Sequence, residues 1–166
     1  MTHRFAVTVA KEYLTFSAAH FITIPGHQCE RMHGHNYRVG VRVTGAVDEA
    51  TGFVVDFGVI KQVVRPLIEA VDHRVLLPAA NPVLAYRTEG EHTLVTYRGV
   101  HQFTLPSAHV VMLPVADTTA ERLAAYFAER VGNALRLGGA DLGELRVEVE
   151  ESVGQSASFT VELGPQ

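Results

Sequence analysis

Three histidines near the start of the chain have the residue type and spacing of metal ligands. His33 and His35 are two residues apart at the start of a strand-like segment, and His20 ends an earlier one. Side chains two apart on a strand point to the same side, so pairing of the two strands would bring three imidazoles together. Three neutral imidazoles suit Zn²⁺ and leave a fourth coordination position open, as in catalytic zinc sites. Ordinary surface histidines are the alternative, because a His-x-His pair alone is weak evidence.

Two further groups could transfer protons. Asp72 precedes His73 directly after a helical segment, and a carboxylate beside an imidazole can orient the ring and raise its basicity. Taken alone, a histidine favoured by the end of a helix is the simpler interpretation. Cys29 is the only cysteine and lies beside Glu30 and Arg31. This polar setting favours an accessible thiol over the buried one that is usual for a lone cysteine.

Glu151 follows a strand-like segment, residues 145–150, in which apolar and polar side chains alternate. The alternation places Glu151 on the apolar side of the strand, where a carboxylate needs a partner. A solvated acidic edge is the alternative, and the pattern itself does not select Glu151 over Glu148 or Glu150.

Length and composition set the frame for these groups. The 166 residues, 47% apolar and 19% charged, fit a single globular domain spanning residues 1–166. The net charge of −4 argues against a nucleic-acid partner. No apolar run is long enough to cross a membrane, and the N-terminus has no signal-peptide core. One cysteine cannot form an internal disulfide, which favours a reducing, cytoplasmic setting.

Six elements are expected to position the candidate residues. Strand patterns cover residues 5–16, 37–44, 145–150 and 158–163, and a turn around Gly154 makes the last two a hairpin. Helical spacing covers residues 57–71, where Pro66 should kink or break the helix. A second helix starts near residue 119 with Thr118 as N-cap, and Gly138 and Gly139 end it.

The segment of residues 78–114 reads as an inserted β-element, too small to carry its own core. Residues 93–97 and 102–105 predict short strands around a turn at Arg98 and Gly99, and residues 110–113 predict a third. The whole order indicates an α+β fold, with a four-stranded antiparallel sheet and two helices on one face. Neighbouring subunits are expected to cover the other face.

Several motifs, in the same order, resemble those of the 6-pyruvoyl-tetrahydropterin and 6-carboxy-5,6,7,8-tetrahydropterin synthase family. The resemblance covers nearly the whole chain outside the insert. The matching segments are FSAAH (16–20), CxxxHGH (29–35), GFVVDFG (52–58), VDH (71–73), TAE (119–121) and ES (151–152).

The resemblance implies a fold, an assembly and residue roles. The fold would be the tunnelling fold, a trimeric barrel that pairs into a homohexamer with active sites between subunits. Zn²⁺ would be the cofactor, and the roles would be metal ligation by His20, His33 and His35, proton transfer by Cys29, Asp72 and His73, and substrate binding by Glu151, Thr119 and Glu30.

The substrate would be 7,8-dihydroneopterin triphosphate, and the favoured product is 6-carboxy-5,6,7,8-tetrahydropterin, used in queuosine and deazapurine synthesis. Cys29 and Glu30 together keep a second reaction open, because family members with Glu-x-x-His-Gly-His form 6-hydroxymethyl-dihydropterin for folate synthesis. The 6-pyruvoyl product is a third possibility. Ser152 and Arg122 depart from the family pattern, which leaves room for a non-catalytic pterin- or purine-binding module.

Overall fold

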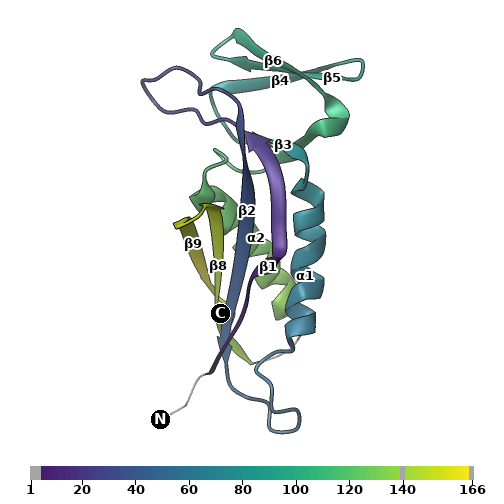
Figure 1. Cartoon of the computed structure of the whole chain (residues 1–166), viewed down its shortest axis with the longest axis vertical. Helices are drawn as coiled ribbons and strands as arrows, with labels where there is room; N and C mark the ends of the chain where they lie inside the picture. Colours follow the sequence, from purple (N-terminus) through teal and green to yellow (C-terminus); the bar gives the residue numbers. More distant parts are fainter. Residues whose placement is uncertain (1–4, 139–140, 165–166) are drawn as a thin grey trace.

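The computed structural model describes residues 5–138 and 141–164, without the side chains of residues 11–13. The long strands and both helices run along the longest axis of the molecule, and a smaller sheet lies at one end (Figure 1). In chain order the elements are β1 (Phe5–His20), β2 (His33–Gly45), α1 (Phe57–Val71), β3 (Arg74–Pro78), β4 (Leu84–Glu89), β5 (His92–Tyr97), β6 (Val100–Pro106), the 3-10 turn η1 (Ser107–His109), β7 (Val110–Leu113), α2 (Ala120–Arg136), β8 (Leu142–Ser152) and β9 (Gln155–Glu162).

The larger sheet has six strands in the order β7-β3-β1-β2-β8-β9. β1, β2, β8 and β9 pair antiparallel, and Gly154 turns the hairpin with a φ of 80°. The α+β class is therefore confirmed, but four strands is wrong as a count. β3 and β7 add two parallel strands at one edge. β3 was not predicted, because five residues are too few to show a periodic pattern, whereas β7 is the strand predicted at residues 110–113.

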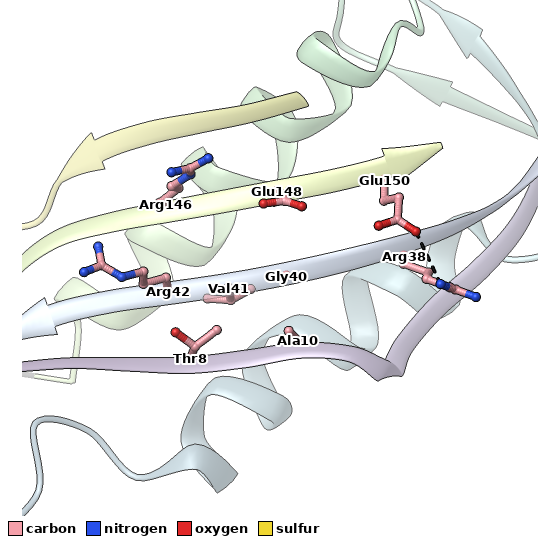
Figure 2. Close-up of a pocket in the computed structure, with 9 residues that line it drawn as sticks. All are labelled: Thr8, Ala10, Arg38, Gly40, Val41, Arg42, Arg146, Glu148 and Glu150. Carbon is pink, nitrogen blue, oxygen red and sulfur yellow. Dashed lines mark hydrogen bonds and ion pairs between the residues drawn. The ribbon is translucent and has the colours of Figure 1, made fainter. Parts of the chain in front are cut away.

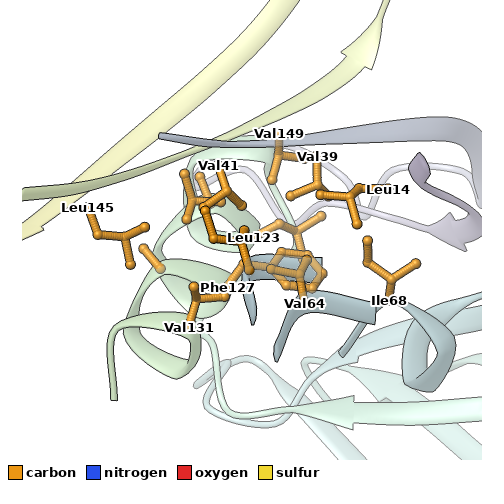
Figure 3. Packing of buried hydrophobic residues seen from close by; sticks show 14 of the residues in the cluster. Leu14, Val39, Val41, Val64, Ile68, Leu123, Phe127, Val131, Leu145 and Val149 are labelled. Carbon is orange, nitrogen blue, oxygen red and sulfur yellow. The ribbon is translucent and has the colours of Figure 1, made fainter. Parts of the chain in front are cut away.

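The core lies between this sheet and the two helices, which pack on the same face (Figure 3). The predicted alternation of β2 is confirmed, because Val39 and Val41 are fully buried while Arg38 and Arg42 are exposed. Burying a valine or leucine side chain stabilises a fold by about 1.5–3 kcal/mol. This face therefore holds the ends of β1 and β2, and with them the histidines, in a fixed register.

The N-cap of α2 lies one residue later than predicted. α1 spans residues 57–71 as predicted and runs through Pro66 without a break. α2 is capped by Thr119, whose hydroxyl accepts from the backbone of Arg122, so the prediction of Thr118 as N-cap is wrong. Thr118 is buried instead, and its hydroxyl donates to the carbonyl of Phe21. α2 ends at Arg136, before Gly138, while Gly139 lies outside the described residues.

The insert forms a three-stranded sheet, β4-β5-β6. The predicted strands around Arg98 and Gly99 are confirmed as β5 and β6, and both turn residues have positive φ. β4 was not predicted, and the predicted third strand is β7, which joins the larger sheet. The insert packs on the end of that sheet through a second apolar cluster that includes Phe21 and Leu77.

Candidate active site

The three predicted metal ligands converge at the end of β1 and the start of β2. His20 lies directly opposite His33 in the antiparallel register, and His35 shares its side of β2. One ligand atom from each of His20, His33, His35 and Glu151 lies within 4.8 Å of the other three. The sequence-based expectation that three imidazoles meet is thus realised, with a carboxylate added to the group.

Hydrogen bonds fix how the rings present their nitrogens. The Nδ1 of His20 donates to the carbonyl of Thr118 at 2.9 Å, and the Nδ1 of His33 donates to the carbonyl of Arg31 at 3.0 Å. A carbonyl can only accept, so in the neutral rings both Nε2 atoms are unprotonated. These two Nε2 atoms lie 3.1 Å apart. Two lone pairs facing each other at this distance are the arrangement that a shared cation stabilises.

Two further observations fit a metal ion. The buried Nε2 of His35 makes no hydrogen bond to a described residue, although Oε1 of Glu151 lies 2.8 Å away. Burial lowers the pKa of His20, which keeps the ring neutral as ligation requires, and the Thr118 hydrogen bond only partly opposes this shift. The chemistry and placement of these donors therefore fit a metal such as Zn²⁺.

Sequence reasoning identified the candidate ligands but missed two groups around them. Thr118 supplies the carbonyl that orients His20. The hydroxyl of Tyr37 lies 3.3 Å from Nε2 of His20, and burial raises its pKa, so it stays a phenol. The two-residue spacing from His35 on one strand face was the available signal for Tyr37.

Glu151 lies on the apolar side of β8, as the alternation predicted, and its partner there is His35. Glu150 points to the other face, where it pairs with Arg38 at 3.3 Å. The sequence pattern did not select among Glu148, Glu150 and Glu151. In the structure Glu151 lies at the histidine cluster, whereas Glu150 pairs with Arg38 on the opposite face of the sheet. Whether Glu151 also binds a pterin is not tested by these contacts and stays a prediction.

Asp72 and His73 form an acid–base pair at the edge of β1. Oδ1 of Asp72 accepts from the backbone of Ser17 at 2.8 Å, and Oδ2 lies 3.0 Å from Nδ1 of His73. The Ser17 hydrogen bond, and then the His73 contact, hold the pKa of Asp72 below its ordinary value. His73 has a φ of 54° and a side chain that is 82% exposed. Strained backbone at an exposed imidazole is typical of functional positions.

Cys29 and Glu30 lie in the loop between β1 and β2. The Cys29 side chain is half-buried against the apolar cluster of Phe21 and Leu77. Burial first, and then the charges of Asp117 and Glu30, raise the pKa of its thiol. The thiol is thus less accessible than its polar sequence neighbours suggested, but it is not fully buried. Glu30 is exposed, with Oε2 4.0 Å from Nδ1 of His33.

Two hollows lie along the sheet away from the helices. The first, here called the dyad hollow, measures about 470 Å³. It is lined by Ser17, Ala18, Ala19, Gly34, His35, Asn36, His73, Arg74, Val75 and His109. The second, called the arginine hollow, measures about 180 Å³ and is drawn in Figure 2. It is lined by Thr8, Ala10, Arg38, Gly40, Val41, Arg42, Arg146, Glu148 and Glu150.

The dyad hollow shares His35 with the candidate metal ligands, but its Ser17 and Asn36 side chains lie on the other side of the sheet. Ser17 and Asn36 face each other across β1 and β2, and the Ser17 hydroxyl donates to the Asn36 amide oxygen at 2.6 Å. Each is adjacent in sequence to a residue facing the core, so their side chains point to the opposite side of the sheet. None of the contacts found among the described residues joins Cys29 or the histidine cluster to the Asp72–His73 pair within one chain.

The fold and the site define a class: an α+β protein with a histidine-rich candidate metal centre and a separate acid–base pair. The family model described as 6-pyruvoyl tetrahydropterin synthase matches residues 8–162. The chain belongs to this family, as its motifs indicated, and it is an enzyme of the synthase or lyase type. No helix among the described residues has the length and apolar character needed to span a membrane.

Relatives and solved structures agree with the family. A protein of Methanocaldococcus jannaschii, provisionally named 6-carboxy-5,6,7,8-tetrahydropterin synthase, is 33% identical over 148 residues, which cover 88% of this chain and 89% of the relative. A Pyrococcus abyssi protein with the same provisional name is 31% identical over 152 residues, 91% of this chain and 88% of the relative.

The structure is also similar to that of 6-pyruvoyltetrahydropterin synthase from Plasmodium vivax. The TM-score is 0.89 and the identity 26%, with 96% of this chain and 99% of the other covered. Variants of that Plasmodium protein have also been solved in which a glutamate described as a catalytic residue is replaced by alanine or by cysteine. The Plasmodium vivax protein shares the α+β architecture that holds the histidine cluster here.

Proposed function

We propose that this protein is a zinc-dependent enzyme that converts 7,8-dihydroneopterin triphosphate into 6-carboxy-5,6,7,8-tetrahydropterin. The observation that carries the proposal is the pair of unprotonated Nε2 atoms of His20 and His33, 3.1 Å apart beside the buried His35 nitrogen. The names of the archaeal relatives support the choice of product. All elements would belong to one pterin synthase domain, residues 1–166.

His20, His33 and His35 would hold the zinc ion. Zinc bound there would supply Lewis acidity toward the hydroxyl groups of the substrate side chain. Thr118 and Arg31 keep two of the rings in the tautomer that ligation needs, through their backbone carbonyls.

Asp72 and His73 would act as a proton-transfer pair. Asp72 stays ionised and accepts from Nδ1 of His73, which leaves Nε2 of the neutral ring free to take a proton. The raised pKa of Cys29 means that its thiol needs such a base nearby. The proposed assembly, a dimer of trimers, would place Cys29 of one subunit beside the Asp72–His73 pair of another.

Glu151 and Thr119 are proposed to bind the pterin ring. A carboxylate accepts two parallel hydrogen bonds from the 2-amino and N3 edge of a pterin, a geometry with charge-assisted strength. Glu151 is half-buried at the cluster, 2.8 Å from His35, so a ring bound by it would lie next to the metal. Thr119 lies one residue beyond Thr118, which contacts His20.

The test is product analysis by mass spectrometry after incubation of the zinc-loaded protein with 7,8-dihydroneopterin triphosphate. The 6-carboxy product with release of acetaldehyde and triphosphate is expected. Turnover to 6-pyruvoyl-tetrahydropterin or 6-hydroxymethyl-dihydropterin would move the chain to another branch of the family. Tight pterin binding without turnover would instead indicate a binding module.

The hydroxymethyl product is the second candidate, and one observation favours it. Glu30 lies 4.0 Å from His33 at the cluster, while the Plasmodium vivax relative has a glutamate described as catalytic. In this branch Glu30, with its exposed carboxylate, would replace Cys29 as the base.

A further inference from the structure

The dyad hollow is rich in cationic and neutral nitrogen groups. His73 and Arg74 line it from the start of β3 and the residue before it, and His109 lines it from the turn before β7. The side chains of Ser17 and Asn36 also line it. Among the described residues that line this hollow, none carries a carboxylate. The carboxylate of Asp72 contacts His73, one of the lining residues. Its two oxygens already accept from the backbone of Ser17 and from His73. The hollow therefore offers donors to an anion with little opposing charge at its surface.

Arg74 is held in place at the edge of this hollow. One of its guanidinium nitrogens donates to the carbonyl of Ala108, in the 3-10 turn next to His109. A guanidinium has five N–H donors, so most remain for a ligand after this bond. Holding the side chain reduces the entropy that binding would otherwise cost. Arg74 and His109 are thus brought together because β3, which starts at Arg74, runs parallel to β7, which follows His109.

The arginine hollow provides the contrast. Arg38, Arg42 and Arg146 line it, but Glu148 and Glu150 lie among them (Figure 2), and Glu150 pairs with Arg38. Carboxylates there compensate the arginines and would repel an anion. The dyad hollow, with about 470 Å³ against about 180 Å³, is also the larger of the two.

We infer that the dyad hollow is a subsite for a phosphate chain, in which Arg74 and His109 bind the anionic oxygens. The inference rests on the proposed function, because the proposed substrate carries a triphosphate on the side chain that reacts. A phosphate chain bound beside His73 would leave that side chain next to the proton-transfer pair. Arginine suits this role, since its planar donors match phosphate oxygens in pairs.

The probe is inorganic tripolyphosphate, titrated by calorimetry into the full-length protein as purified, with zinc content measured before and after. Arg74→Gln should weaken its affinity about tenfold to a hundredfold, the usual effect of losing a charge-assisted hydrogen bond. Arg74→Lys should retain part of the affinity because the charge stays. His109→Gln, which does not disturb the Arg74 contact, should weaken it about threefold to tenfold. Arg42→Gln, in the arginine hollow, is the matched control and should bind as the wild type does.

Unchanged affinity in both Arg74→Gln and His109→Gln would overturn the subsite, as would a loss confined to Arg42→Gln. A parallel measurement separates this outcome from failure of the proposed function. If the wild type turns over the pterin triphosphate and Arg74→Gln leaves its KM unaltered, the function stands and the subsite falls. If no pterin is turned over while Arg74→Gln still weakens tripolyphosphate binding, the subsite stands and the function falls.

Discussion

Removing the metal should lower the Tm of this protein, and the size of the fall depends on the zinc-binding free energy and on the length of the chain. The proposed ligands come from β1 and β2, so the site exists only in the folded chain, and zinc binding adds to folding stability. At a free zinc concentration about 100 times the dissociation constant, that contribution is about 2.7 kcal/mol. Unfolding entropy of about 2.1 cal/mol/K per residue over 166 residues converts it into a fall of about 8 °C in Tm.

The apo protein should also retain a specific defect. Without a cation, the Nε2 atoms of His20 and His33 face each other at 3.1 Å, and one ring must turn or take up a proton. Turning His20 would break the hydrogen bond from its Nδ1 to the carbonyl of Thr118, in a fully buried position. An unpaired buried polar group costs about 1–3 kcal/mol. This cost is already contained in the dissociation constant for zinc, so it explains part of the fall of about 8 °C and does not add to it.

The assay is scanning calorimetry at fixed protein concentration, with and without a strong chelator. Wild type is compared with the double variant His33→Ala, His35→Ala and with a control, His92→Ala, His101→Ala, which removes two exposed histidines of the insert. The chelator should shift the wild type and the control but not the first double variant. An equal shift in all three, or zinc retained at one equivalent by the ligand variant, would refute the metal assignment.

Four other outcomes are expected. Glu151→Gln should raise KM for the pterin about tenfold to a hundredfold at unchanged zinc content, and zinc loss would make Glu151 a ligand instead. Cys29→Ala should abolish formation of the 6-carboxy product while zinc stays bound. Glu30→Ala should still form the 6-carboxy product but lose any 6-hydroxymethyl side product. Chromatography with fluorescence detection resolves the two products. Light scattering should give a hexamer, and a monomer at micromolar concentration would contradict the proposed assembly. Zinc content followed against pH should hold at neutral pH and fall in acid as the imidazoles take up protons, and the lowered pKa of His20 extends the range of its neutral form below its ordinary value.

Side-chain alternation made the sheet and the metal ligands predictable. In a strand, every second side chain points to the same face, so alternating apolar and polar residues mark a strand with one buried face and show which side chains share it. It thus placed His33 and His35 together and put Glu151 on their side of the sheet. His20 meets the other two histidines only if β1 pairs with β2. The sequence spacing suggested this pairing but did not determine its register.

The sheet membership of short elements was not predictable in this way. β3 has five residues, too few for a pattern, and β7 was predicted as a strand but assigned to the insert, although it lies at the edge of the larger sheet. β4 was missed within the insert, although the turn at Arg98 and Gly99 marked its two neighbours. The setting of Cys29 could not be read from its polar sequence neighbours either, because the apolar cluster that buries its side chain comes from the insert and from β3.

The one-residue error at the start of α2 has a direct consequence for the site. Because Thr119 takes the capping position, Thr118 precedes the helix with its side chain buried and bonded to the carbonyl of Phe21. Its own carbonyl is then left to accept from His20, a residue 98 positions earlier in the chain. A Thr-Thr pair thus does two things at once: the second residue begins the helix, and the first sets the tautomer of the most buried imidazole in the cluster. A change of helix register by one residue would leave every candidate ligand in the sequence and still displace the Thr118 carbonyl that sets the tautomer of His20.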